Sequence, residues 1–158
     1  MERMEDMNDV LNDLIKINND RIAEYQLAMN EAGDKDMSYK SLFEQMIAES
    51  TQNKDELASV IEKNEGIIED ETTTSGKIYR AWMEIKGTFT DVDKTTILDS
   101  CHFSEDATQR AYDAALETGR VPDEKVKNML VAQQEKLKQS KDLIKEHLDA
   151  HTTLKNLS

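Results

Sequence analysis

The chain has few residues that interrupt helices: its 158 residues include five glycines and one proline. In a helix interior, glycine costs about 1 kcal/mol and proline about 3 kcal/mol relative to alanine, so these residues tend to mark helix ends. The stretches between them are long, show helical periodicity and contain no strand pattern. The breakers are Gly33, Gly66, Gly76, Gly87, Gly119 and Pro122.

Other scarcities exclude whole classes of protein. A single cysteine, Cys101, excludes an internal disulfide framework, and its place on an apolar stripe predicts a buried thiol. No run of 18 apolar residues exists, so the sequence predicts no membrane span. Residues 1–6 are acidic and lack the apolar core of a signal peptide. We therefore expect a cytoplasmic protein without a membrane partner.

Basic residues are also scarce, because 20 lysines and arginines stand against 33 acidic residues, a net charge of −13. Residues 1–72 hold 19 acidic and 7 basic side chains, net −12, whereas residues 122–158 are net +1. An acidic surface repels phosphate backbones, which argues against nucleic acid as a partner. The charge either keeps the surface soluble or forms an acidic docking face for a basic partner.

Apolar residues recur at three- and four-residue spacings, which predicts four long helices. We expect them at about 6–32, 37–64, 90–118 and 122–150, with a short helix at about 75–86 and a tail over 151–158. The expected caps are Gly33, Ser75 and Thr90, with Pro122 in the first turn of the last helix. The connection between the second and third long helices is long enough to return along the bundle. The predicted fold is therefore all-α, a single-domain, ferritin-like four-helix bundle with a crossover, over residues 1–158 and with its core at about 7–150.

Several segments carry a resemblance to a known family. They are 11–15 and Tyr25 in the first helix, 79–86 with its Arg-Ala-Trp sequence, Ile97-Leu98, Glu105-Asp106, Tyr112, Leu116 and Gln134. In these the chain resembles the bacterial ferritin-like four-helix-bundle proteins of the domain of unknown function 2383 family. The resemblance covers roughly residues 7–150 and implies a ferritin-like fold but no reaction.

The three histidines do not supply a di-iron site. Such sites in bundles use Glu-x-x-His on two helices, and none of the histidines follows a glutamate by three. Asp99-x-x-His102 is the nearest pattern, but it lies on the third long helix rather than on the second or fourth. His147 and His151 could clip a metal at i, i+4, although we expect both to be partly exposed. The sequence thus predicts no catalytic residue, cofactor or metal site, with weak carboxylate-only binding left open at Glu24, Glu49 and Glu105.

Polar residues interrupt the apolar stripes near the middle of all four long helices. They are Asn18, Arg21, Glu49, Ser50, Asn53, Glu105, Thr108 and Gln133. A buried carboxylate requires a partner, and Arg21 can offer a bidentate one. We expect Arg21 to pair with Glu105 and to lie near Glu49, and Glu105 to lie near Gln134. The layer is either a structural hydrogen-bonded network or a small-molecule pocket.

Trp82 lies on the apolar stripe of the short helix, so we expect it to anchor that helix on the bundle. Two functional hypotheses remain. In the first, the chain is a non-enzymatic helical bundle that acts by protein interaction, also as a homodimer, in stress physiology or scaffolding. In the second, it is a degenerate or carboxylate-only metal protein with oxidase or storage chemistry.

Overall fold

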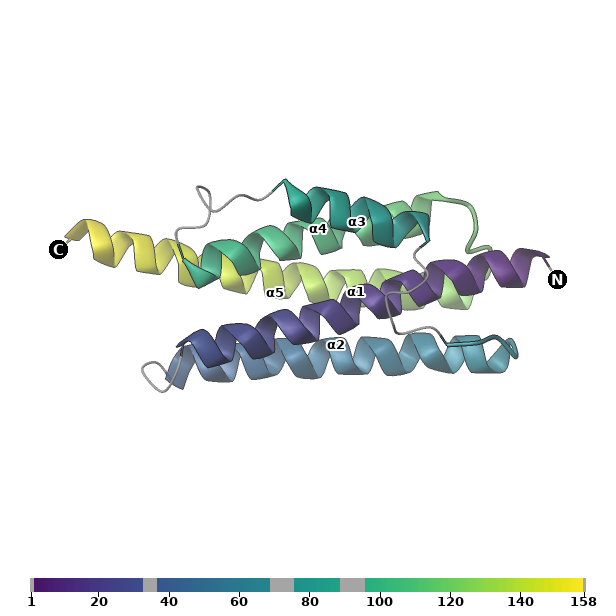
Figure 1. Ribbon diagram of the computed structural model, residues 1–158, viewed down its shortest axis with the longest axis horizontal. Coiled ribbons are helices and arrows are strands. Elements are labelled where there is room, and N and C mark those ends of the chain that lie inside the picture. Colours follow the sequence, from purple (N-terminus) through teal and green to yellow (C-terminus); the bar gives the residue numbers. More distant parts are fainter. Residues whose placement is uncertain (1, 33–36, 69–75, 89–95, 158) are drawn as a thin grey trace.

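The computed structural model describes residues 2–32, 37–68, 76–88 and 96–157, with side chains described for 6–31, 39–68, 76–88 and 96–150. Within these residues there are five helices and no strand (Figure 1). They are α1 (Glu2–Ala32), α2 (Met37–Lys63), α3 (Lys77–Gly87), α4 (Ile97–Glu117) and α5 (Glu124–Leu157). The prediction of an all-α helical bundle is confirmed.

The helices pack as two long pairs with the short helix laid against them. α1 packs along α2, α4 packs along α5, and α3 contacts both α1 and α4 (Figure 1). α1 also contacts α4, whereas α2 and α5 make few direct contacts. None of the described helices combines the length and the apolar character needed to cross a bilayer.

Most helix bounds agree with the sequence, but α5 does not end where predicted. It continues as a helix to Leu157, past residue 150, where we expected a tail. No glycine or proline stands between Glu124 and Leu157, so no backbone feature ends the helix earlier. The predicted cap at Gly33 lies outside the described residues.

Two helix starts differ from the prediction because a side chain nearer the helix satisfies its free amides. The Thr96 hydroxyl accepts a hydrogen bond from the Asp99 amide at 3.1 Å and caps α4, which begins at Ile97. The predicted cap, Thr90, lies outside the described residues. At α5 the Asp123 carboxylate accepts from the Val126 amide at 3.1 Å, so Pro122 precedes the helix instead of lying in its first turn.

Two glycines after helix ends are there for different reasons. Gly119, after α4, has a φ of 71°, the left-handed conformation that glycine adopts at low cost. After α2 that conformation belongs to Glu65, with a φ of 58°. Gly66 then donates its N–H to the Ile61 carbonyl at 2.9 Å. A Cβ at Gly66 would collide with the Asn8 side-chain amide, so a larger residue there would have to displace that amide.

The N-terminus of α3 is capped by a residue of another helix. The Asp13 carboxylate of α1 accepts hydrogen bonds from the amides of Gly76 at 3.0 Å and of Ile78 and Tyr79 at 3.2 Å each. A Cβ at Gly76 would collide with this carboxylate. The predicted cap, Ser75, lies outside the described residues; the N-cap residue that the structure gives is Gly76, which has no side-chain cap of its own.

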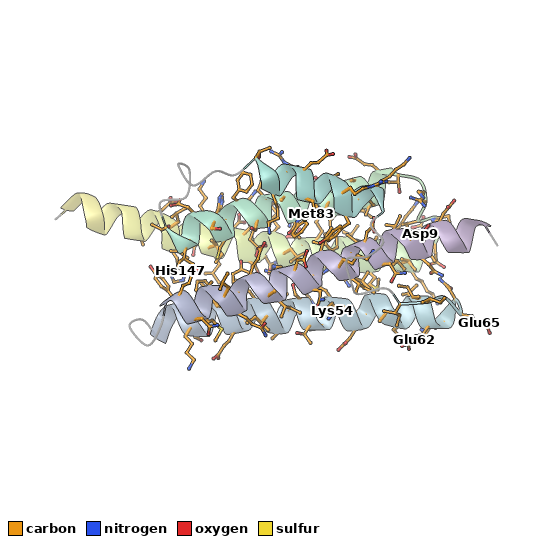
Figure 2. All side chains as sticks on the ribbon, in the orientation of Figure 1. Asp9, Lys54, Glu62, Glu65, Met83 and His147 are labelled. Atoms are coloured by element: carbon orange, nitrogen blue, oxygen red, sulfur yellow. The ribbon has the colours of Figure 1, made fainter. Side chains whose placement is uncertain are left out.

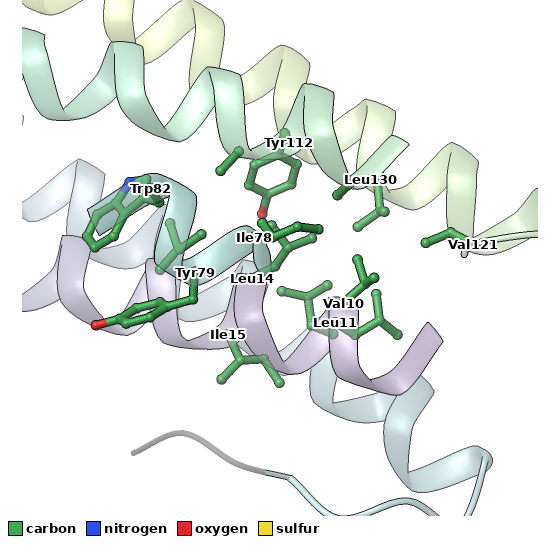
Figure 3. Packing of buried hydrophobic residues seen from close by; sticks show 14 of the residues in the cluster. Val10, Leu11, Leu14, Ile15, Ile78, Tyr79, Trp82, Tyr112, Val121 and Leu130 are labelled. Atoms are coloured by element: carbon green, nitrogen blue, oxygen red, sulfur yellow. The ribbon is translucent and has the colours of Figure 1, made fainter. Parts of the chain in front are cut away.

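Trp82 anchors α3 as predicted, with 1% of its surface exposed. It packs with Ile78 and Tyr79 over α1 and α4 (Figure 3), and its indole N–H donates to the Thr108 hydroxyl at 3.3 Å. These residues belong to a large apolar cluster built from all five helices. A second, smaller cluster is made of Tyr25, Ala28, Leu42, Phe43, Met46, Leu98, Cys101 and Ile144.

Candidate functional site: an arginine-centred polar layer

A layer of buried polar side chains lies between the two apolar clusters. Each of its members has at most 2% of its surface exposed. The predicted mid-helix layer is therefore confirmed, and Glu49 lies at its edge with 15% of its side chain exposed. We call this set the central layer: Asn18, Arg21, Tyr25, Ser50, Asn53, Glu105, Thr108, Tyr112 and Gln133, with Glu49 at the edge.

The guanidinium of Arg21 is surrounded by oxygen atoms from α2 and α4. Its Nε donates to Glu105 Oε1 at 2.8 Å, and Nη1 donates to the Ser50 hydroxyl at 2.8 Å and to the Met46 carbonyl at 3.2 Å. Nη2 lies 3.2 Å from Glu49 Oε1. The predicted pairing of Arg21 with Glu105 is confirmed, and so is its position near Glu49.

A second group of hydrogen bonds joins the same layer to α5. The Tyr112 hydroxyl donates to Gln133 Oε1 at 2.7 Å and accepts from the Asn18 amide at 3.0 Å. The Asn18 carbonyl oxygen in turn accepts from the Ser50 hydroxyl at 2.9 Å and from the Asn53 amide at 3.2 Å. All four long helices are thus connected through polar side chains at one level.

Gln134 is not part of the layer, and the expectation that it lies near Glu105 is wrong. Its amide donates to the Gln109 carbonyl at 3.2 Å and to Asp113 at 2.7 Å, toward the outside of the α4–α5 pair. Gln133, one residue earlier, points inward instead. Successive residues on a helix differ in direction by about 100°, so a register error of one residue moves the side chain out of the core.

The two carboxylate oxygens of Glu105 differ in their hydrogen bonding. Its Oε1 accepts from both Arg21 and the Tyr25 hydroxyl. Its Oε2 is buried and has no hydrogen-bond partner among the described residues. Sequence reasoning placed Tyr25 only on an apolar stripe; its spacing of four residues from Arg21 is the signal that points its hydroxyl into the layer.

Two acidic groups in and beside the layer, the Tyr25 hydroxyl and the Cys101 thiol, keep their protons at neutral pH. Burial raises the pKa of Tyr25, and the Glu105 carboxylate raises it further. Burial likewise raises the pKa of the Cys101 thiol to about 12. Burial alone would lower the pKa of Arg21, but the Glu105, Tyr25 and Glu49 groups together raise it, so the guanidinium stays charged.

Glu49 is the member of the layer closest to solvent. Burial raises its pKa, although Arg21 and a hydrogen bond from Ser140 oppose the shift. The Ser140 hydroxyl lies 2.9 Å from Oε1 and 3.0 Å from Oε2 of this carboxylate. Glu49 borders a groove of about 360 Å³ between α2 and α5, lined also by Gln45, Lys136, Gln139, Asp142, Leu143 and Glu146.

The other residues considered as ligands lie apart from the layer. Glu24 forms an ion pair with Lys86 of α3, and the Lys86 ammonium also lies 4.4 Å from the centre of the Trp82 ring. His147 packs edge-on against Tyr39, with 5.9 Å between the ring centres. The His151 side chain lies outside the described residues.

The layer does not have the composition of a dinuclear metal centre. Such a centre in a helical bundle draws four carboxylates and two imidazoles from its helices. Here two carboxylates face one guanidinium, which already supplies a positive charge. Among the residues that the structure describes, no three His, Cys, Asp or Glu side chains come together to hold a metal.

Comparison with known proteins identifies a family. No curated protein and no solved structure matches the chain. The family model described as domain of unknown function (DUF2383) matches residues 6–118, which include α2, α3 and α4 and all but the first four residues of α1. The match therefore contains three of the four long helices that build the central layer. The match covers well over half of the 158 residues, so the chain belongs to the DUF2383 family.

Proposed function

We propose that the chain is a non-enzymatic, ferritin-like helical bundle that acts in the cytoplasm by binding another protein. The observation that carries this proposal is the position of Arg21. Its guanidinium occupies the middle of the bundle between Glu49 and Glu105, where a ferritin-like enzyme would need a metal. A positive charge at that point disfavours a cation, and the two carboxylates that would bind one are already paired with it.

The order of contacts along the helices supports a ferritin-like topology. Arg21 contacts Met46 and Asn8 contacts Asn64, so α1 and α2 run antiparallel. Glu105 opposite Arg21 and Tyr112 opposite Asn18 make α4 antiparallel to α1 as well. α2 and α4 then run in the same direction. Two parallel consecutive long helices need a connection that returns along the bundle, as the segment containing α3 would do (Figure 1).

The surface charge supports a basic partner. Most of the net charge of −13 lies in residues 1–72, which form α1, α2 and the segment after them. Glu62 on α2 and Glu65 just after it lie at the outside of this pair (Figure 2). Asp9 on α1 is exposed as well, but its carboxylate lies 3.5 Å from the Arg120 guanidinium. Complementary charge steers a partner to such a face and fixes its orientation.

One observation favours the alternative, a carboxylate-only metal protein with storage or oxidase chemistry. Glu105 Oε2 is a buried acceptor without a partner among the described residues. A bound cation would satisfy such a carboxylate oxygen. Two carboxylates alone would bind iron poorly, because imidazole ligands are missing from the layer.

Metal analysis of protein purified without chelator separates the two functions. We expect well under one iron or manganese ion per chain, and two tightly held ions per chain would establish the alternative. The interaction itself is tested by affinity capture with the wild-type chain and with a variant carrying Asp55→Lys and Glu62→Lys, at two exposed positions of α2. Capture of a basic protein by the wild type that is lost in the variant supports the proposal. Capture that is equal for both chains contradicts the acidic docking face.

A further inference from the structure

The surroundings of the Arg21 guanidinium form an oxygen cage. Four oxygen atoms from two helices lie within hydrogen-bond distance of its nitrogens: Glu49 Oε1 at 3.2 Å, Ser50 Oγ at 2.8 Å, Glu105 Oε1 at 2.8 Å and the Met46 carbonyl at 3.2 Å. The Tyr25 hydroxyl also reaches Glu105. Carboxylate, carbonyl and hydroxyl oxygens are the ligands that hard divalent cations take, and waters would complete the six or more that such a cation requires.

The charge of the cage exceeds that of its occupant. Two carboxyl groups face one guanidinium, so at a pH at which both are ionised the cage keeps one negative charge beyond what Arg21 neutralises. A divalent cation would balance both carboxylates.

A second, independent observation points to the same conclusion. Glu105 is 1% exposed, and its Oε2 has no hydrogen-bond partner among the described residues. A buried polar atom left unpaired is costly, and water or an ion commonly accounts for one. A cation held by Glu105 through both oxygens would use this atom.

We propose that Arg21 fills a latent binding site for a hard divalent cation such as Ca²⁺, Mg²⁺ or Mn²⁺, formed by Glu49, Ser50, Glu105 and the Met46 carbonyl. The Arg21 guanidinium supplies the positive charge that pairs with both carboxylates, so the layer stays assembled without a metal ion. Truncating Arg21 to alanine empties the cage. The space left is occupied by a bound ion together with the waters that complete its coordination. This inference concerns the interior of the bundle and does not depend on the identity of the protein partner.

The test compares Arg21→Ala with the wild type by titration with CaCl₂, MgCl₂ and MnCl₂, using calorimetry and thermal melting. We expect Arg21→Ala to bind one ion per chain, more than about tenfold tighter than the wild type, and to melt at a higher temperature with the ion than without. The double variant Arg21→Ala/Glu105→Gln should lose this response. The matched control is Arg110→Ala, which removes the same charge from an exposed arginine paired with Asp106 at 3.3 Å.

Each outcome decides the proposal. An Arg21→Ala chain that is unfolded alone but folds on addition of Ca²⁺ or Mn²⁺ supports it, and so does a folded chain that gains a saturable site. Arg21→Gln, which keeps a polar side chain of smaller volume, provides a second variant with the same expectation. The proposal is overturned if neither variant binds an ion or gains melting temperature with it, or if both remain unfolded in its presence. It is also overturned if Arg110→Ala shows the same binding and the same gain in melting temperature. A wild-type chain that binds an ion through Glu105 would also overturn it, because Arg21 would then not be the occupant.

Discussion

Arg21 brings one positive charge into a layer that contains two carboxylates, and it is 2% exposed. Removing charges from water costs several kcal/mol per ion, so the network persists because each charge has an ionic partner and further hydrogen bonds. Loss of the arginine and loss of one carboxylate are therefore not equivalent. The first leaves the buried Glu105 carboxylate and the half-buried Glu49 without a cation, and the second leaves the guanidinium with Glu49 and its neutral acceptors.

This asymmetry gives a prediction for two substitutions. Arg21→Met should lower the free energy of unfolding by roughly 3–5 kcal/mol, since it leaves the Glu105 carboxylate buried without its charge partner. Glu105→Gln should cost less, because its amide oxygen can still accept from Arg21. Urea denaturation at neutral pH without added divalent ions measures both. An equal or larger loss for Glu105→Gln would show that the guanidinium is not the centre of the network.

Glu49 should make stability depend on pH in an unusual direction. Its native pKa is raised above that of an ordinary glutamate, chiefly by burial, so the native state favours the protonated carboxyl more than the unfolded state does. A raised native pKa contributes stability that is fully present below the unfolded-state pKa and is lost as the pH rises through the native pKa.

The effect of Glu49 is isolated by comparison with Glu49→Gln. The melting temperature of the wild type, relative to that of the variant, should fall as the pH is raised from about 4 to 7. Tyr25 and Cys101 stay neutral over this range, because burial raises the pKa of each. A difference that grows in favour of the wild type with rising pH would mean that the pairing with Arg21 outweighs burial.

At the scale of single residues, the sequence is informative where periodicity sets direction. Arg21 and Glu105 fall on inward stripes, and the rule that a buried charge needs a partner is enough to pair them. Tyr25 falls on a stripe too, but periodicity does not distinguish a ring in an apolar cluster from a hydroxyl in a polar layer. Gln134 lies outside the layer, although the sequence places it near Glu105, because adjacent residues of a helix point about 100° apart.

The element with the least stability of its own is α3, which has 11 residues. Isolated helices shorter than about 12–15 residues are marginal in water, so α3 depends on the bundle. Two of the contacts that hold it stand out: Trp82 is buried near its middle, and Asp13 accepts from three amides at its start.

We predict that Asp13→Ala loosens α3 while the four long helices stay folded. The substitution removes the acceptor of three amides, and losing a capping side chain costs about 0.5–2 kcal/mol. Hydrogen exchange at the Ile78 and Tyr79 amides should accelerate, with little change at α2 amides. Asp13→Asn, which keeps one acceptor oxygen, should give an intermediate effect. Unchanged exchange at α3 would show that the cap from Asp13 is not needed to hold the helix.

At the scale of elements, the sequence predicts what local signals determine. Gly119 marks the end of α4, because a left-handed residue there is a backbone requirement of the helix end itself. The cap of α3 could not be found in this way. Asp13 and Gly76 are 63 residues apart, so the contact exists only after α1 and α3 have packed.

The whole molecule carries a net charge of −13, concentrated in the first 72 residues. Like charges held on one compact surface repel each other more than the same charges on an expanded chain. Exposed ion pairs such as Arg110–Asp106 contribute little to the free energy of unfolding, so screening them by salt removes little stability. Repulsion is therefore the larger salt-sensitive contribution to the stability of this molecule.

We predict that salt stabilises the protein. The screening length falls from about 30 Å at 0.01 M to about 8 Å at 0.15 M ionic strength, so the melting temperature should rise between these two NaCl concentrations. Glu62→Lys, at an exposed position of α2, should reduce the rise because it lowers the charge of the acidic region. Lys125→Glu, at an exposed position of α5, is the matched reversal and should increase it. A melting temperature that falls with NaCl would instead mean that attractive ion pairs, among them those that connect Arg120 to Asp6 and Asp9, outweigh the repulsion.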